Sequence, residues 1–322
     1  MQTTTLIATI IWASFILGSH AWGPITHLYL CSLVAERYEN GTSTTTTAVH
    51  SFLTGCNSPD SLKHVWPELH SLEFAAHLFE HAVHHHKQYT IVHNSTTTDL
   101  VEFSLGFGCH IASDEVGHHK NGFLTPSSVD HEVEFNVDSM IFHEREEDRF
   151  DSTTAKGVMS EDATDLILNT ATSYHMFNVD GHTSAAATAM TRRYLRAKTK
   201  TPIAINRARI QSAINRFQAI TSAEHLLVRI QPRSVYKFEL KRNSFCNVSN
   251  YQDVASNFNI SAEWAISTCA LWRSTMMTLL IKSDDTNKRK SEEFRDDAAE
   301  AIHRAVNDMF SANHGTSCPV SI

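Results

Sequence analysis

One stretch of the chain, residues 103–119, carries residue types at a spacing that could hold a metal ion. His110, Asp114 and His118 are each four residues apart. Residues four apart on an α-helix lie one above the other on the same face, so two imidazoles and a carboxylate would point the same way. These are zinc-ligand types. The flanking residues are apolar, which predicts a buried helix, and buried polar groups are costly unless they are paired or bind metal.

Further candidate ligands stand on both sides of this stretch. Asp60 follows a Gly and a Pro that indicate a turn, and it begins the next segment. His70 and His77 are seven residues apart, which is two turns of a helix. Downstream, His131 and Glu134 are three residues apart and would share a helix face. The chain as a whole has 21 histidines, and this high count is compatible with metal binding.

The N-terminal sequence predicts a secretory signal peptide over residues 1–21. An apolar run, residues 6–18, precedes Ser19-His20-Ala21, which places small residues at the −3 and −1 positions of a cleavage site. Cleavage there would leave Trp22 as the first residue of the mature chain. No second apolar run reaches about 18 residues, so we expect no transmembrane segment.

Other features favour a secreted glycoprotein with disulfide bonds. The chain has six cysteines, an even number, and six allow 15 pairings that the sequence does not distinguish. Four acceptor patterns for N-glycosylation are present, at Asn40, Asn94, Asn247 and Asn259. The expected location is therefore extracellular.

Composition and periodicity predict a mostly α, single multi-helix domain over residues 22–322. The 322 residues are 42% hydrophobic and 19% charged, which is typical of a globular chain. Apolar residues recur at helical spacing in most segments, and 226–239 is the one candidate strand. The formal net charge of −8 counts against a protein whose main task is to hold a nucleic-acid backbone.

Taken together, the motifs resemble the zinc-dependent phospholipase C superfamily. They are Trp22-Gly-Pro-Ile-Thr-His27, Pro59-Asp60, the pair His70 and His77, His110-x3-Asp114-x3-His118, and His131-x2-Glu134. The superfamily includes bacterial phospholipases, single-strand nucleases and the catalytic domain of glycosylphosphatidylinositol-specific phospholipase D, which the chain resembles most. The resemblance covers roughly residues 22–140 and implies a fold of the zinc-dependent phospholipase C and P1 nuclease type.

The resemblance also implies about three zinc ions, two of which would share a carboxylate. The ligands of these two would be the amino and carbonyl groups of Trp22 with His27 for one, and Asp60, His110 and either His70 or His77 for the other. Asp114 would bridge the two ions. The choice between His70 and His77 stays open at this point.

The third zinc ion would be held by His118, His131 and Glu134. The family places its last acid four residues after its histidine, whereas Glu134 follows His131 by three. Alternative ligands for this ion are therefore Asp138 or the pair His143 and Glu147.

These ligands predict phosphodiester hydrolysis by metal-activated water, with Asp60 and Asp114 as catalytic residues. Two close zinc ions lower the pKa of a shared water and offset charge on a phosphate. Asp60 would in addition orient or deprotonate that water. The chain has no Gly-x-Ser-x-Gly motif that would indicate a serine nucleophile instead.

The predicted function is that of a secreted zinc-dependent phospholipase, of C or D type, which hydrolyses phospholipid or glycosylphosphatidylinositol phosphodiester bonds at a membrane surface. Which side of the phosphate is cut depends on how the substrate lies. Two alternatives are a secreted single-strand nuclease on the same scaffold and a non-catalytic metal-binding protein. A nuclease would need basic and aromatic groups near the ligands, and no basic run lies there in the sequence.

Overall fold

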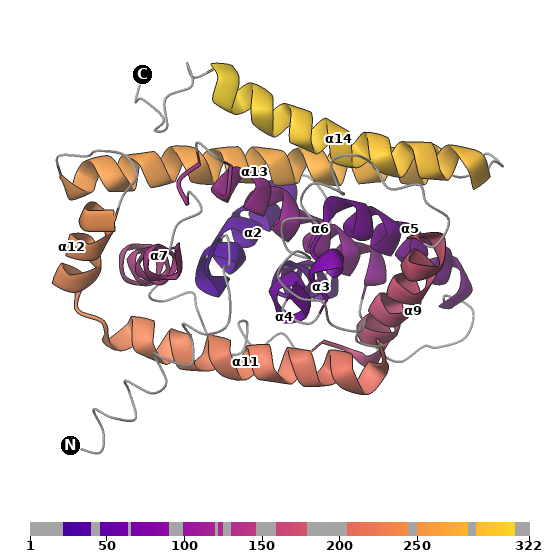
Figure 1. The fold of residues 1–322 in the computed structure, drawn as a ribbon, viewed down its shortest axis with the longest axis horizontal. Coiled ribbons are helices and arrows are strands. Elements are labelled where there is room, and N and C mark those ends of the chain that lie inside the picture. The colour runs from indigo at the N-terminus through magenta and orange to yellow at the C-terminus, as the bar shows by residue number, and fades with distance from the viewer. Residues whose placement is uncertain are drawn as a thin grey trace.

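The computed structural model describes residues 22–39, 46–63, 66–89, 99–119, 122–124, 130–145, 159–178, 205–243, 250–282 and 288–312. These residues form helices and contain no strand, which confirms the mostly α prediction (Figure 1). In chain order the helices are α2 (Pro24–Glu39), α3 (Thr46–Cys56), α4 (Pro59–Lys63), the short 3₁₀ helix η1 (Pro67–Leu69), α5 (Leu72–Tyr89), α6 (Leu100–Gly117), α7 (Asp130–Glu144), α9 (Glu161–Asn178), α11 (Arg207–Ile230), α12 (Arg233–Asn243), α13 (Tyr251–Lys282) and α14 (Lys288–Ala312).

Several sequence predictions concern residues outside this described part. They are the signal peptide, the glycosylation patterns at Asn40, Asn94 and Asn247, and the two cysteines Cys246 and Cys318. Asn259 is described and lies exposed on α13. Among the described helices, none is long and apolar enough to cross a membrane.

Helix α6, which contains most of the predicted ligand stretch, is the central helix of the fold. Asp99 caps its start, because one oxygen of that side chain accepts hydrogen bonds from the backbone N–H groups of Val101 and Glu102, each at 3.0 Å. Nearly every residue from Phe103 to Gly117 is buried. The helix packs against α3, α5 and α13, so the predicted burial of the ligand stretch is confirmed.

Two glycines allow α3 and α6 to approach each other closely. A Cβ atom on Gly106 would lie 2.0 Å from the carbonyl oxygen of Phe52 in α3. A Cβ atom on Gly55 would lie 2.0 Å from the carbonyl oxygen of Phe103 in α6. Both obstacles are backbone atoms, which cannot rotate away. The contact therefore requires glycine on both helices, and it brings Cys56 and the following α4 beside α6.

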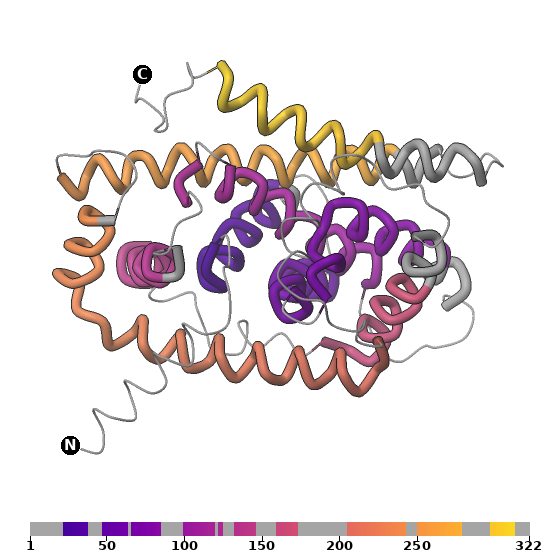
Figure 2. The backbone as a smooth tube through the Cα atoms, viewed as in Figure 1, coloured from indigo at the N-terminus to yellow at the C-terminus, as the bar shows by residue number. Residues whose placement is uncertain are grey.

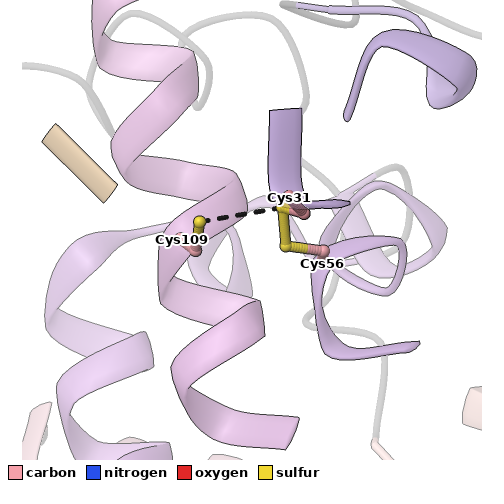
Figure 3. A group of neighbouring side chains, drawn as sticks. All are labelled: Cys31, Cys56 and Cys109. Atoms are coloured by element: carbon pink, nitrogen blue, oxygen red, sulfur yellow. Dashed lines mark hydrogen bonds between the residues drawn. A yellow bond between two sulfur atoms is a disulfide. The ribbon is translucent and has the colours of Figure 1, made fainter. Parts of the chain in front are cut away.

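Two disulfide bonds tie the neighbouring helices to this contact. Cys31 of α2 is bonded to Cys56 of α3, and Cys109 of α6 is bonded to Cys269 of α13. The sulfur atoms of Cys31 and Cys109 lie 3.7 Å apart, so the two bonds are neighbours in the core (Figure 3). Four helices are thus cross-linked around the central part of α6.

The outer part of the fold is a frame of long helices. Helices α11 and α13 run along opposite sides of the molecule, and the short α12 joins them at one end (Figures 1 and 2). Helix α11 packs on α4, α7 and α9, whereas α13 packs on α2, α6 and α14. The helices that carry the candidate ligands lie between these two sides.

The prediction of a strand over residues 226–239 is wrong. This segment forms the end of α11 and most of α12, which meet at Pro232. The residues of this region that face the core are Val228, Tyr236 and Leu240. Tyr236 and Leu240 are four residues apart, which is the spacing of one helix face and not of a strand. The alternating pattern arose because other apolar residues in the segment point outward, away from the core.

The N-terminus of α2 is capped by a side chain from α7. Both oxygens of the buried Asp138 accept hydrogen bonds from this end: Oδ2 from the N–H of Ile25 at 3.1 Å, and Oδ1 from the N–H and the hydroxyl of Thr26 at 2.9 and 2.5 Å. The first N–H groups of a helix have no partner within the helix, and the oxygens of Asp138 supply the missing acceptors. Asp138 therefore fixes the position of α2, which carries His27.

The first prediction concerns this cap. We expect Asp138→Asn to lower the free energy of unfolding by about 1–3 kcal/mol, because an amide keeps one acceptor oxygen and leaves buried N–H donors unpaired. Asp99→Asn is the matched control, since Asp99 caps α6 through a single oxygen and Asn is an equally good capping residue. Denaturant unfolding followed by circular dichroism measures both. Equal stability of the two variants would contradict the proposed role of Asp138.

The second prediction concerns the contact between α3 and α6. In an unhindered helix Gly→Ala would stabilise the protein by about 0.5–1 kcal/mol. We expect Gly106→Ala to destabilise it instead, by about 1–3 kcal/mol, because the new methyl group would meet the backbone of Phe52. The sign of the change in melting temperature distinguishes a steric clash, which lowers it, from an unhindered helix position, where alanine would raise it. The reverse change in the same helix, Ala112→Gly, is the control and should cost only about 1 kcal/mol.

Candidate metal centre

Four buried or nearly buried side chains meet at one point of the described structure. Asp60, His70, His110 and Asp114 each offer one ligand atom, and these four atoms lie within 4.8 Å of one another. Asp60 comes from the first turn of α4, and His70 follows η1. His110 and Asp114 come from successive turns of α6. Residues that are 54 positions apart in the chain therefore share one small volume.

Five of the six separations within this group are close to the edges of a zinc tetrahedron, and the sixth, between the two carboxylate oxygens, is within 4.8 Å. Nε2 of His70 lies 3.2 Å from Nε2 of His110, 3.3 Å from Oδ2 of Asp114 and 3.5 Å from Oδ1 of Asp60. Nε2 of His110 lies 3.6 Å from the same Asp114 oxygen and 3.5 Å from the same Asp60 oxygen. A tetrahedral zinc ion with ligands at about 2.0–2.2 Å separates them by about 3.3–3.6 Å. The four atoms are therefore spaced to fit one such ion.

A backbone contact sets the tautomer of His110. Its Nδ1 lies 2.7 Å from the carbonyl oxygen of Cys56, so Nδ1 carries the hydrogen and donates it. In the neutral ring Nε2 then holds a lone pair, which faces the carboxylate oxygens of Asp60 and Asp114. Lone pairs that face one another are unfavourable unless a cation lies between them. A second hydrogen bond of this kind is typical of metal-binding histidines.

Asp114 directs its two oxygens to two different groups. Oδ2 faces His70 and His110, whereas Oδ1 lies 3.1 Å from Nε2 of His27. The rings of His27 and His110 are stacked, with their centroids 3.6 Å apart. His27 is fully buried and comes from α2. This geometry is that of a carboxylate able to serve two adjacent ions.

Burial and neighbouring groups favour the metal-binding protonation states of His27 and Asp114, but not that of His70. Burial, followed by the effect of His110, lowers the pKa of His27 to about 4, so this imidazole is neutral at pH 7. Burial alone would raise the pKa of Asp114, but His27 and His110 hold it well below its usual range. Burial and Lys63 act to lower the pKa of His70, yet hydrogen bonding to Asp114 and Asp60 raises it. The raised pKa means that a metal ion would compete with a proton for His70.

The burial of the donor atoms also favours a divalent cation at this place. Both carboxylate oxygens of Asp114 and the Nε2 of His27 are buried, and their polar neighbours at 3.1–3.6 Å are one another and the other imidazoles of the group. Such a buried cluster of nitrogen and oxygen donors is costly unless a cation lies among them, and zinc prefers donors in this combination. The arrangement is therefore suited to a metal ion and poorly suited to an apolar core.

The structure brings some of the predicted ligands to this group and leaves others elsewhere. His70 belongs to it, whereas His77 lies half-buried on α5 outside it. Trp22 packs next to it: the indole is buried, and its N–H donates to the carbonyl oxygen of Ser113, 3.0 Å away. This places the predicted first residue of the mature chain against the part of α6 that carries Asp114.

Of the ligands predicted for a third ion, His118 and Glu134, whose side chains are described, do not join the group of four. His118 caps the end of α6, and its Nδ1 lies 3.4 Å from the carbonyl oxygen of Leu124. Glu134 is buried on α7. His131 also lies on α7, but its side chain is outside the described residues.

The alternatives for that third ion have other tasks in the fold. Asp138 caps α2, as described above. His143 contacts the end of α11, because its Nε2 lies 3.0 Å from the carbonyl oxygen of Val228 and 3.1 Å from that of Gln231. Glu147 lies outside the described residues.

Two ionisable residues near the group were not among the sequence candidates. Nζ of Lys63 lies 3.7 Å from Oδ1 of Asp60, one turn away on α4, and the three-residue spacing of this pair is the signal that could have found it. Glu224 comes from α11, far along the chain. Burial of its carboxyl group, followed by the nearby Asp138 and Asp60, raises the pKa of Glu224 well above its usual range. No local pattern marks Glu224.

Comparison of the chain with protein-family models, with curated proteins and with solved structures gave no match. The interpretation of this site therefore depends on its geometry and on the sequence motifs.

The third prediction distinguishes the two candidate histidines. We expect His70→Ala to weaken zinc binding by at least tenfold, because it removes one of four converging donors. His77→Ala, a half-buried histidine on the neighbouring helix, is the matched control and should bind zinc like the unchanged protein. Isothermal titration calorimetry of metal-free protein with zinc measures both. Loss of binding in the His77 variant alone would contradict the assignment.

Proposed function

We propose that this chain is a zinc-dependent phosphodiesterase of the zinc-dependent phospholipase C type, acting on phospholipid or glycosylphosphatidylinositol phosphodiester bonds. The observation that carries the proposal is the position of Asp114, whose two oxygens face His27 on one side and His70 with His110 on the other. A bridging carboxylate between two donor groups is what the sequence resemblance implied for this residue. The absence of a serine-nucleophile motif agrees with a mechanism based on water.

The chemistry of such a site is supplied jointly by metal and protein. Bound zinc would provide a water of lowered pKa and positive charge for the phosphate oxygens. Asp60, His70 and His110 would hold one ion through Oδ1 and the two Nε2 atoms, and Asp114 and His27 would hold the other. Cys56 keeps His110 in the ligand tautomer through its carbonyl oxygen.

Two side chains beside the ligands have further roles in this proposal. Asp60 would also orient the attacking water or accept its proton. Lys63 adds a positive charge 3.7 Å from Asp60, which favours the approach of a phosphate group. Neither role requires the third ion that the resemblance implied.

The fourth prediction tests the bridging carboxylate. We expect Asp114→Asn to lower phosphodiester hydrolysis by at least 100-fold and to reduce bound zinc, because an amide binds cations far less well than a carboxylate. The change is nearly isosteric, so the helix should persist in circular dichroism. Glu115→Gln is the control: Glu115 is adjacent in sequence, but its carboxylate lies 3.2 Å from Nδ1 of His303, outside the ligand group, so the variant should lose little activity.

The assay compares three substrates with protein before and after a chelator. They are a glycosylphosphatidylinositol-anchored protein, phosphatidylcholine and single-stranded DNA. Chelator-sensitive cleavage of either lipid, restored by added zinc, supports the proposal, and its products distinguish C-type from D-type cleavage. Cleavage of DNA alone would indicate the nuclease alternative. Stoichiometric zinc binding without hydrolysis of any of the three would indicate a non-catalytic metal-binding protein.

A further inference from the structure

Four large apolar side chains are exposed where α11 meets α12. Leu226 and Ile230 near the end of α11 are 60% and 57% exposed, and Val235 and Phe238 of α12 are 42% and 61% exposed. These four residues are here named the apolar corner. They account for four of the five exposed large apolar residues of the described structure, so the exposure is concentrated at one place. Such a concentration marks an interaction site more often than chance exposure does.

Helix geometry groups these exposed side chains into one pair on α11 and one pair on α12, on either side of the bend at Pro232. Leu226 and Ile230 are four residues apart and share a face of α11, and Val235 and Phe238 are three apart on α12. The inward faces of the same helices are filled by Val228, Tyr236 and Leu240, which are buried. The corner is therefore additional to the core residues that hold the helices in place.

The corner is held firmly by polar contacts. Nε2 of His143 donates to the carbonyl oxygens of Val228 and Gln231, at 3.0 and 3.1 Å. The guanidinium of Arg233 donates back to the carbonyl oxygen of His143 at 2.9 Å. The side-chain amide of Gln231 donates to Asn136 of α7, also at 2.9 Å. The apolar side chains thus project from a fixed turn and not from a frayed helix end.

The two helices that form the corner are strongly basic, in contrast to the rest of the chain. Residues 207–243 contain eight Lys or Arg and two Asp or Glu, whereas the whole chain has a formal net charge of −8. Three of these cations are paired with acids of other helices: Arg207 with Asp165, Lys237 with Glu144 and Arg242 with Glu132. Glu224 lies near Asp60 and Asp138, and Glu239 is paired with Arg242 at 2.6 Å. Exposed Arg229 and Lys241 remain beside the apolar side chains.

We propose that the apolar corner docks onto an anionic phospholipid surface. Exposed Leu and Phe side chains enter the boundary between headgroups and acyl chains, and Lys and Arg at the same level attract anionic headgroups. A second copy of this chain is a poorer occupant, because it would place two basic surfaces against each other. The proposal deepens the proposed function and rests on it for its purpose, since a phosphodiesterase of lipids needs access to a membrane. The exposed apolar side chains and the basic residues beside them are observed independently of that function.

Vesicle sedimentation tests the docking. The unchanged protein should sediment with vesicles of phosphatidylserine and phosphatidylcholine, and more weakly with phosphatidylcholine alone. The double variant Leu226→Ser, Phe238→Ser should bind at least tenfold more weakly, because it lacks two apolar side chains that would be buried in the membrane. Met277→Ser is the matched control: Met277 is also exposed, but it lies towards the far end of α13, and binding should not change. Equal binding by the double variant would overturn the proposal.

A charge variant tests the attraction between the basic side chains and the anionic headgroups. Arg229→Gln with Lys241→Gln should weaken binding to the anionic vesicles about fivefold for each charge removed at low salt, and the loss should shrink as salt is added. Binding that is insensitive to these charges and to salt would contradict an anionic surface. If the unchanged protein dimerises in analytical ultracentrifugation and the Leu226, Phe238 double variant does not, the corner is an interface between copies, and the proposal is overturned.

Two further measurements separate this proposal from the proposed function. Asp114→Asn should still bind vesicles, because Asp114 lies in the metal centre and not at the corner. The Leu226, Phe238 double variant should keep its activity on a water-soluble, short-chain phosphodiester and lose it on vesicles. Vesicle binding without hydrolysis by the unchanged protein would leave the docking intact and remove the proposed function. Hydrolysis on vesicles that the double variant retains in full would remove the docking alone.

Discussion

The structure depends on how a group of carboxylates and imidazoles is kept together in a buried place. Asp60, Asp114 and three histidines lie within a few ångströms of one another, largely shielded from water. Such groups repel or leave lone pairs unsatisfied unless protons or cations lie between them. The surrounding fold must therefore hold these groups at close range against their mutual repulsion. A bound ion would meet it and would stabilise the folded chain.

Rigidity around α6 has three sources that act at the same place. The close approach through Gly55 and Gly106 fixes α3 on α6, the two disulfide bonds add α2 and α13, and Asp138 fixes the start of α2. Two of these groups are adjacent in sequence to a candidate ligand or to its partner. Cys56 accepts the hydrogen bond of His110, and Cys109 immediately precedes it. Stability of the core and geometry of the site are thus produced by the same contacts.

Helix α11 has different tasks on its two sides. Its inward side packs on α4, which carries Asp60, and brings the carboxyl group of Glu224 near the metal centre. Its outward side carries Leu226 and Ile230 with the basic residues around them. If both proposals hold, one helix connects the surface that binds lipid to the centre that acts on it.

The sequence by itself determined the helical class and the central ligand helix, because apolar periodicity and the spacing of His110 and Asp114 are local properties of one segment. Two disulfide pairings, the position of His70 in place of His77 within the group, and the approach of Glu224 were decided only by the tertiary structure. Each depends on segments that are far apart in the chain. The strand prediction over residues 226–239 failed for a related reason. Periodicity assumes that apolar residues face the core, and in this segment Leu226 and Phe238 face outward.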